Sequence, residues 1–374
     1  MPAPTSTRPR LGHQSSLDGL RGIAVAVVVI FHLGWNWLPG GFFGVDVFFV
    51  LSGFLITTLL LEEHIHAGRI SLGTFFYRRM IRLYPALIGL VAFSTFFTLV
   101  AHRETGVGRA LSIASSVLFY YANWLSMVDT AGWFGGMPHT WSLAIEGQFY
   151  LLWALIVAGL ARRHATPEKR SSLLKILLVI AGGIVVASTS WRASLWSEGV
   201  TWLRPYLGTD TRLDGLFLGA IIALVRLQHA PAPPEPATSR ASHWAYSLLG
   251  TVSVGAIAYL VCTVQFGSAL PYYLGFTFVS LASATLLFSL LRDPETFWAR
   301  LLRWPALVWL GKISYSLYIW HVPVLKVMSP QRLTSVGLPL WVAEAARLLV
   351  SLVVATASYY LIERTCLRLK KRLE

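Results

Sequence analysis

The sequence contains a series of apolar segments, most of them long enough to cross a lipid bilayer as a helix. Because 55% of the 374 residues are hydrophobic and only 13% are charged, one water-soluble core could not cover this much apolar surface. A spanning helix needs about 20 predominantly apolar residues. Hydropathy places eleven such segments at residues 17–38, 42–61, 83–101, 110–127, 139–160, 172–190, 206–226, 244–262, 271–291, 306–327 and 340–362. We therefore expect an all-α, polytopic integral-membrane helical bundle.

The positions of the basic residues predict how the chain threads the membrane. Most of the 31 Lys and Arg lie in six stretches, which are the two tails and the connections after the second, fifth, seventh and ninth segments. Basic loops face the cytoplasm, and all six do so only if one segment does not cross. The best candidate is 110–127, which is rich in Ser, Tyr and Asn. We predict about ten transmembrane helices, both termini cytoplasmic in the plasma (inner) membrane, and 110–127 as a re-entrant or interfacial segment.

The apolar segments and the basic stretches also divide the chain into regions. We expect a cytoplasmic tail over 1–16, a transmembrane domain over 17–362 with a flexible Pro- and Ala-rich linker at 228–240, and a basic cytoplasmic tail over 363–374. The net charge of +14 is explained by contact with anionic lipid and does not require nucleic acid as a partner. Two cysteines cannot form a disulfide framework, and no His or Cys spacing typical of a metal site occurs, so no metal is expected.

Ionisable residues at membrane depth are costly and usually functional, which draws attention to Arg21 and His32 in the first span. They are eleven residues apart, so they return to nearly the same helix face about 16 Å apart along the axis. Arg21 could hold an anionic donor near the inner surface while His32 serves as a base further across. The alternative is a snorkelling Arg and a hydrogen-bonded core His.

Asp46 begins the second span, and the short loop before it would bring it close to His32, whose tautomer a carboxylate could fix. Its alternative role is that of a carboxylate favoured at a helix N-terminus. Ser142, Glu146 and Tyr150 recur every four residues and so share a helix face. Glu146 is then either a charge partner or binder of an acceptor hydroxyl, or a structural hydrogen-bonding group.

Three further groups stand out. Arg212 and Asp214 lie in the seventh segment, where an internal Arg–Asp pair is the simplest account of the local chemistry. The tenth segment presents its polar residues at a helical spacing that gives them one face: Ser314, Tyr318 and His321. The residues expected to bind the acceptor or to support the site are Trp141, Ser142, Tyr150, Arg212, Asp214, Ser314, Tyr318 and His321. A dense basic cluster precedes the third span and suits either lipid headgroups or the phosphates of a nucleotide ligand such as coenzyme A: Arg78, Arg79 and Arg82.

In combination these residues resemble the acyltransferase-3 family of integral-membrane O-acyltransferases, over about residues 16–365. Seven pieces match in order: LDGLRGIAVAVVVIFH, GFFGVDVFFVLSGFLI, FFYRRMIRLYP, TWSLAIEGQFY, TRLDGLFLGA, LGKISYSLYIWHVPV and SYYLIERT. Two positions depart from the family pattern. Gly147 stands where many members have a second acidic residue, and Thr365 replaces a usual Pro.

The resemblance implies transfer of an acetyl or other short acyl group from cytoplasmic acyl-CoA, as co-substrate, to a hydroxyl of a sugar, glycan or sugar-bearing metabolite. By position, Arg21 and His32 correspond to the family's first-span pair, Arg79 and Arg82 to its arginine motif, and Glu146 to its Trp-Ser-Leu-x-x-Glu carboxylate, which starts at Trp141. His32, Glu146 and Asp46 are then the expected catalytic group. Some members carry an extracytoplasmic SGNH hydrolase-like domain, and we expect this chain to be the stand-alone form.

Several alternatives stay open from the sequence. His32 could deprotonate the acceptor or carry the acyl group. Ten spans with buried charges also describe transporters, although no inverted repeat is visible. The chain could also present acyl groups to another acyltransferase. The acceptor, the acyl chain length and the oligomeric state are not specified by these motifs.

Overall fold

A computed structural model describes residues 11–35, 37–102, 105–128, 134–164, 166, 169–228 and 239–373. Over these ranges the chain is almost entirely helical and contains no β-strand, as expected for an all-α membrane bundle. Three expected features lie wholly or partly outside the described residues: most of the tail over 1–16, the interior of the linker at 228–240, and the loop that follows 110–127.

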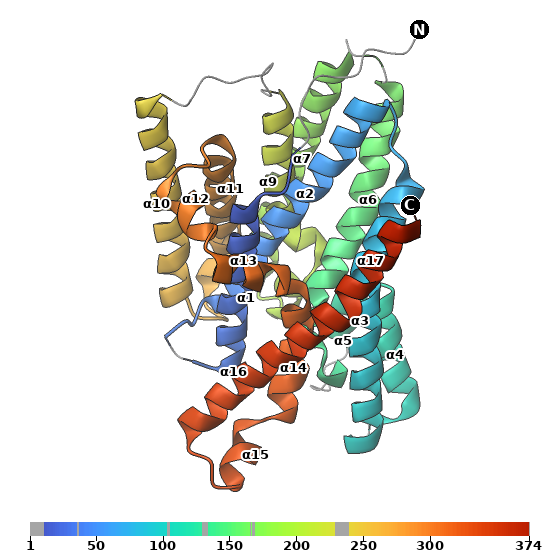
Figure 1. The fold of residues 1–374 in the computed structure, drawn as a ribbon, viewed down its shortest axis with the longest axis vertical. Helices are drawn as coiled ribbons and strands as arrows, with labels where there is room; N and C mark the ends of the chain where they lie inside the picture. Colours follow the sequence, from blue (N-terminus) through green and yellow to red (C-terminus); the bar gives the residue numbers. More distant parts are fainter. Residues whose placement is uncertain are drawn as a thin grey trace.

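The helices follow one another with short connections (Figure 1). In chain order they are α1 (Ser15–Leu33), η1 (Gly41–Phe43), α2 (Gly44–Ala67), α3 (Leu72–Ala101), α4 (Val107–Leu118), α5 (Ala122–Val128), η3 (Phe134–Gly136), η4 (Pro138–Thr140), α6 (Trp141–Arg163), α7 (Arg170–Ser197), α8 (Leu203–Leu207), α9 (Thr209–Gln228), α10 (Arg240–Thr263), η6 (Pro271–Gly275), α11 (Phe276–Arg292), α12 (Phe297–Leu302), α13 (Pro305–Lys312), α14 (Ser314–Val327), α15 (Pro330–Ser335), α16 (Leu340–Ala357), η7 (Ser358–Glu363) and α17 (Arg364–Leu373).

In the described part of the chain, eight helices are long and apolar enough to cross a membrane. They are α1, η1 with α2, α3, η4 with α6, α7, α10, η6 with α11, and the continuous helix from α16 through α17. Each coincides with one of the ten predicted spans. The protein is therefore a multi-pass membrane protein built as an all-α bundle.

The other two predicted spans differ from a simple apolar helix. The segment at 206–226 forms α9, which has 20 residues but carries charged side chains near both ends. The segment at 306–327 is divided at Ile313 into α13, with 8 residues, and α14, with 14 residues. Neither half is long enough to cross alone, and of the polar residues at the break Ser314 is buried whereas Lys312 is exposed.

The segment at 110–127 forms no spanning helix. It consists of α4, with 12 residues, and α5, with 7 residues, and α4 lies beside one end of α3 (Figure 1). The turn between them has Tyr120 at a φ of 57°, the single positive φ of a non-glycine residue among those described. Irregular backbone at membrane depth is tolerated where protein covers it. Here the amide of Gln148 in α6 donates to the Tyr120 carbonyl oxygen at 2.7 Å.

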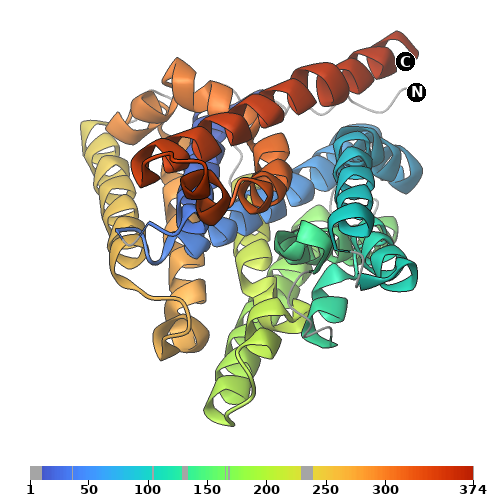
Figure 2. The ribbon, with the colours of Figure 1, turned by 90° about the horizontal axis from the view of Figure 1, so that it is seen from below.

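Glycines let the central helices approach closely. A methyl group on Gly53 of α2 would overlap the carbonyl oxygen of Leu216, and one on Gly219 of α9 would overlap that of Val50. Gly22 of α1 and Gly311 of α13 allow the same close contact between those two helices. Small residues at helix crossings are the usual means of packing in membranes. Figure 2 shows α1 and α2 near the middle of the bundle, between α10–α11 on one side and α3–α7 on the other.

Candidate functional site

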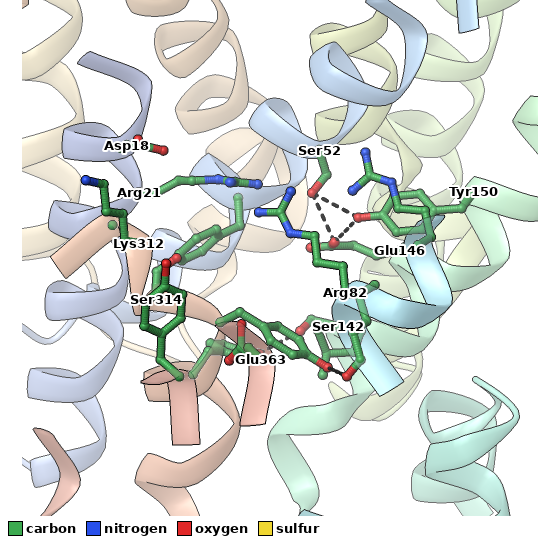
Figure 3. Close-up of a pocket in the computed structure, with 18 of the residues that line it drawn as sticks. Asp18, Arg21, Ser52, Arg82, Ser142, Glu146, Tyr150, Lys312, Ser314 and Glu363 are labelled. Atoms are coloured by element: carbon green, nitrogen blue, oxygen red, sulfur yellow. Dashed lines mark hydrogen bonds between the residues drawn. The ribbon is translucent and has the colours of Figure 1, made fainter. Parts of the chain in front are cut away.

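A cavity of about 420 Å³ lies between α1, α2, α3, α6, the break before α14, and η7. It is lined by eight of the residues singled out in the sequence: Arg21, Arg79, Arg82, Ser142, Glu146, Tyr150, Ser314 and Tyr318. They come from four segments that are distant along the chain, and Figure 3 shows how they converge. The fold thus brings most of the predicted site together.

Cationic side chains occupy the part of the cavity nearest the start of α1 and α3. Arg21 reaches in from α1 and Arg82 from α3 (Figure 3). Arg79, one turn before Arg82, places its guanidinium 5.4 Å from the centre of the Tyr150 ring. Lys312 joins them from the end of α13. Such a group of guanidinium and ammonium ions is suited to bind phosphate oxygens.

Arg78 belongs to the same basic cluster in the sequence but lies outside the cavity. Its side chain is exposed and is absent from the cavity lining. Adjacent residues on a helix point about 100° apart, so Arg78 faces away when Arg79 faces in.

Glu146 is the centre of a small hydrogen-bond network on the opposite wall. Its Oε2 accepts a hydrogen bond from the Ser52 hydroxyl at 3.0 Å and one from the Tyr150 hydroxyl at 2.5 Å. Ser52, which lies on α2, also accepts a hydrogen bond from the Tyr150 hydroxyl at 3.3 Å. The carboxylate is thus fixed in position facing the arginines, as Figure 3 shows for Arg82.

Ser142 and Tyr318 close the inner end of the cavity. Their hydroxyl oxygens are 2.6 Å apart, and the Tyr318 hydroxyl donates to the carbonyl oxygen of His139 at 3.0 Å. Both side chains are buried at the level where α14 contacts η4, the turn that leads into α6. One side of the Tyr318 ring faces the cavity, and the other contacts imidazole rings that do not line it.

Those imidazoles form a cluster of three. The ring centre of His321 lies 4.9 Å from that of His32 and 5.2 Å from that of His139. His139 and His321 are buried, whereas His32 is exposed near the end of α1. Arg21 and His32 do share helix α1 as predicted, but only Arg21 lines the cavity.

Asp46 does not have the predicted role beside His32. Its Oδ1 accepts from the Arg212 guanidinium at 2.8 Å, and both side chains are buried. His32 instead has its Nδ1 at 2.9 Å from the carbonyl oxygen of Val28 on its own helix. The first turn of α2 directs Asp46 toward α9, because the short connection η1 ends between α1 and α11 rather than under His32.

Internal Arg–Asp pairs are present as expected, but Arg212 and Asp214 each pair with a residue of a different helix. Residues two apart on a helix point in nearly opposite directions. Arg212 therefore pairs with Asp46 of α2, while Asp214 accepts from Arg192 of α7 at 3.0 Å and from the Thr277 hydroxyl at 2.6 Å. These groups are buried and tie α9 to its neighbours.

The Arg212 guanidinium also lies 3.6 Å from the centre of the Phe276 ring and 5.7 Å from that of Trp141. Trp141 is thus part of an aromatic enclosure around this ion pair and does not line the cavity. Its role in the structure is to surround a buried charge.

The sequence reasoning gave no role to several residues that the fold places at the site. His139 directly precedes a matched motif that starts at Thr140, and its hydrogen-bond partner Ile319 lies 180 residues away. Tyr120 lines the cavity from the irregular turn after α4, and Glu363 lines it from η7. The η7 turn is π-helical, an irregularity frequent at functional sites, and hydropathy does not reveal it.

Comparison with known proteins identifies a family and several relatives. The acyltransferase domain family (Acyl_transf_3) matches residues 14–364. YrhL of Bacillus subtilis (strain 168) is 34% identical over 93% of this chain and 54% of its own length. "Peptidoglycan O-acetyltransferase OatA" of Listeria monocytogenes is 32% identical over 87% of this chain and 51% of its own length. "O-acetyltransferase OatA" of Staphylococcus aureus (strain NCTC 8325 / PS 47) is 33% identical over 93% and 56%.

The chain therefore spans about half the length of the curated relatives it matches. No solved structure gives a significant match.

Proposed function

This chain belongs to the family of acyltransferase domains, and on that premise we propose that it is a membrane O-acetyltransferase. The donor is acyl-CoA, in the first instance acetyl-CoA, bound from the cytoplasm. The acceptor is a hydroxyl group of a glycan, and the names of the relatives from Bacillus subtilis and Listeria monocytogenes, which both specify peptidoglycan, favour a peptidoglycan-type glycan. Both termini face the cytoplasm of the plasma membrane, in agreement with the distribution of basic residues.

The observation that carries this proposal is the arrangement of charge along the cavity. Arg21, Arg79 and Arg82 lie at one end, and Ser142 with Tyr318 lies at the other. Phosphate groups of coenzyme A would pair with the guanidinium ions. The thioester would then point toward the inner end, where the Tyr318 ring stands between it and the histidine cluster, so transfer to an acceptor at His32 requires this side chain to turn aside.

The chemistry assigned to these residues is a direct transfer. Nδ1 of His32 is engaged by the Val28 carbonyl oxygen, so the other ring nitrogen is free to accept the proton of the acceptor hydroxyl. The acceptor oxygen attacks the thioester carbonyl carbon, the carbon–sulfur bond breaks, and the departing thiolate takes up the proton from His32. Glu146 balances the charge of the arginines and orients them toward the donor.

A reconstituted assay tests the proposal. The purified protein in lipid nanodiscs receives [14C]acetyl-CoA and soluble peptidoglycan glycan fragments. We expect label in the glycan as an alkali-labile ester, and none with His32→Ala. An acceptor labelled only when a second protein is added would favour the acyl-presenting partner. Unchanged acetyl-CoA together with movement of a solute across a vesicle membrane would favour a transporter.

A further inference from the structure

The three imidazole rings behind Tyr318 come from three different segments: His32 from α1, His139 from η4 and His321 from α14. Tyr318 separates them from the cavity, since its ring centre lies 5.6 Å from those of both His139 and His321. The structure thus places the arginines along the cavity and the histidines in a packed cluster on the other side of the Tyr318 ring.

Each imidazole has one nitrogen held by a backbone carbonyl oxygen. For His321 this nitrogen is Nδ1, 2.6 Å from the oxygen of Tyr318. For His139 it is Nε2, 3.0 Å from the oxygen of Ile319. A carbonyl oxygen only accepts, so the held nitrogen carries the hydrogen and the other nitrogen of a neutral ring presents a lone pair.

The two remaining nitrogens, Nε2 of His321 and Nδ1 of His139, are buried and have no hydrogen-bond partner. The side chains are 0% and 3% exposed. A buried acceptor left without a partner is unfavourable, so two of them within one cluster indicate a ligand that donates hydrogen bonds. Lone pairs repel an anion, whereas a hydroxyl group satisfies them.

We propose that His139 and His321 form, together with His32, a binding site for the hydroxyl groups of the acceptor. This inference rests on the proposed function and names the residues that recognise its second substrate. His32 receives the proton of the reacting hydroxyl. His139 and His321 accept hydrogen bonds from the acceptor and hold it beside His32, so both are positioning residues.

A second cavity near the end of α1 gives the sugar ring a place to bind. It has a volume of about 340 Å³ and is lined by Phe31, Gly34, Trp35, Pro39 and Gln265. The Phe31 ring contacts the His32 ring, with 5.3 Å between the ring centres. Aromatic faces and a side-chain amide are suited to pack against a sugar ring and bond its hydroxyls. The lining does not include His32 itself, so this cavity would hold the part of the acceptor beyond the reacting hydroxyl.

Substitution of each histidine by Asn and by Gln tests the two ring nitrogens separately. The amide of Asn reaches the position of Nδ1, and that of Gln reaches the position of Nε2. His321→Gln and His139→Asn thus keep a polar atom at the free position. His321→Asn and His139→Gln keep one only at the position held by the backbone carbonyl.

The variants are compared in the nanodisc assay with [14C]acetyl-CoA and glycan fragments. We expect His321→Gln and His139→Asn to keep kcat/KM for the acceptor within about threefold of wild type, because a hydrogen-bond acceptor remains. His321→Asn and His139→Gln should lose about 10- to 100-fold, the range of one hydrogen bond to a bound substrate. KM for acetyl-CoA should stay constant in all four. His243→Asn, on α10 at the Asp293 pair, is the matched control.

A purely structural role gives the opposite order, because the held nitrogen then matters and the free one does not. Any of three results would overturn the inference while leaving the proposed function intact. The first is this opposite order, the second is an equal loss of kcat/KM whichever ring nitrogen is replaced, and the third is a change in KM for acetyl-CoA alone. A wild-type protein that labels no glycan would overturn the proposed function, and this inference with it.

Discussion

At the scale of single residues, the separation of Arg21 from His32 along α1 is what would let one helix serve two substrates in the proposed function. Arg21 lines the cavity, while His32 lies beyond the Ser142–Tyr318 pair with its imidazole exposed. A base in contact with the donor cavity would be open to cytoplasmic water. Here the base and the phosphate-binding groups are held about three helical turns apart.

Replacing His32 by Ala should abolish acyl transfer and leave the fold intact. A positioned general base contributes about 10²–10⁴ in rate, and this side chain is exposed, so its removal creates no cavity in the core. Label transfer and the melting temperature of the purified variant are the measurements. An alanine variant that keeps a tenth of the wild-type turnover would show that His32 is not the base.

The double substitution Arg79→Ala with Arg82→Ala should raise KM for acetyl-CoA and change kcat much less. Pairing with phosphate is lost equally in the ground state and the transition state, and each charge-assisted contact contributes about 1.5–3 kcal/mol. Steady-state kinetics over a donor series measures both constants.

Arg78→Ala is the matched control, because Arg78 precedes Arg79 directly but points outside the cavity. It should leave KM for the donor unchanged. If Arg78→Ala and the double variant had the same effect, the cluster would act through lipid headgroups and not through the donor.

The sequence was sufficient for residues whose partners lie on the same helix. The spacing of Ser142, Glu146 and Tyr150 correctly predicted a shared face, because helix geometry alone determines it. Pairing between helices could not be predicted in this way. Asp46 binds Arg212 instead of facing His32, and that choice depends on the rotation of α2 against α9, which close contact at Gly53 and Gly219 determines.

At the scale of elements, irregular segments complete a site that the regular helices supply in large part. Lys312 and Ser314 flank the break between α13 and α14, and Glu363 lies in the π-helical turn η7. Hydropathy averages over such a segment and predicts one continuous helix at 306–327. The break follows from packing, because the close approach of Gly311 to the backbone of α1 aligns α13 with that helix and forces a new direction after Ile313.

Gly147→Ala tests the contribution of the irregular segment after α4. The added methyl group would lie 2.5 Å from Cγ of the Tyr120 ring, which lines the cavity from a strained turn. Burial raises the pKa of the Tyr120 hydroxyl, so the displaced group is a neutral phenol. We expect a several-fold higher KM for acetyl-CoA in kinetic measurements, and a lower melting temperature.

Two comparisons isolate the steric cause. Gly159→Ala, on the same helix with open space around it, should change neither quantity. In a Tyr120→Ala background the further change Gly147→Ala should have no additional effect. A full effect in that background would mean that Gly147 acts through something other than the Tyr120 ring.

At the scale of the whole molecule, the two native cysteines report the topology. Cys262 is exposed near the end of α10, and Cys366 lies in α17. With both termini in the cytoplasm, a membrane-impermeant maleimide should label Cys262 in intact cells and Cys366 only after the membrane is disrupted. The single variants Cys262→Ser and Cys366→Ser assign each signal. Labelling of Cys366 alone in intact cells would invert the proposed orientation.

Hydropathy correctly predicts the spans that are uniformly apolar, and it is less informative for segments that contain charged residues. Eight spans appear as apolar helices of sufficient length in the described part of the chain. Helix α9 is different because Arg212 and Asp214 are acceptable only when their partners are present. Its stability in the bundle is a property of the assembled molecule and not of its own composition.

That dependence has a consequence for how the protein is made. A nascent α9 leaving the ribosome could not remain in lipid alone with an unpaired Arg212 and Asp214. Asp46 of α2 and Arg192 of α7, which pair with them, are synthesised earlier and are already at the insertion site. The order of the helices along the chain thus supplies each counter-ion before the charge that needs it.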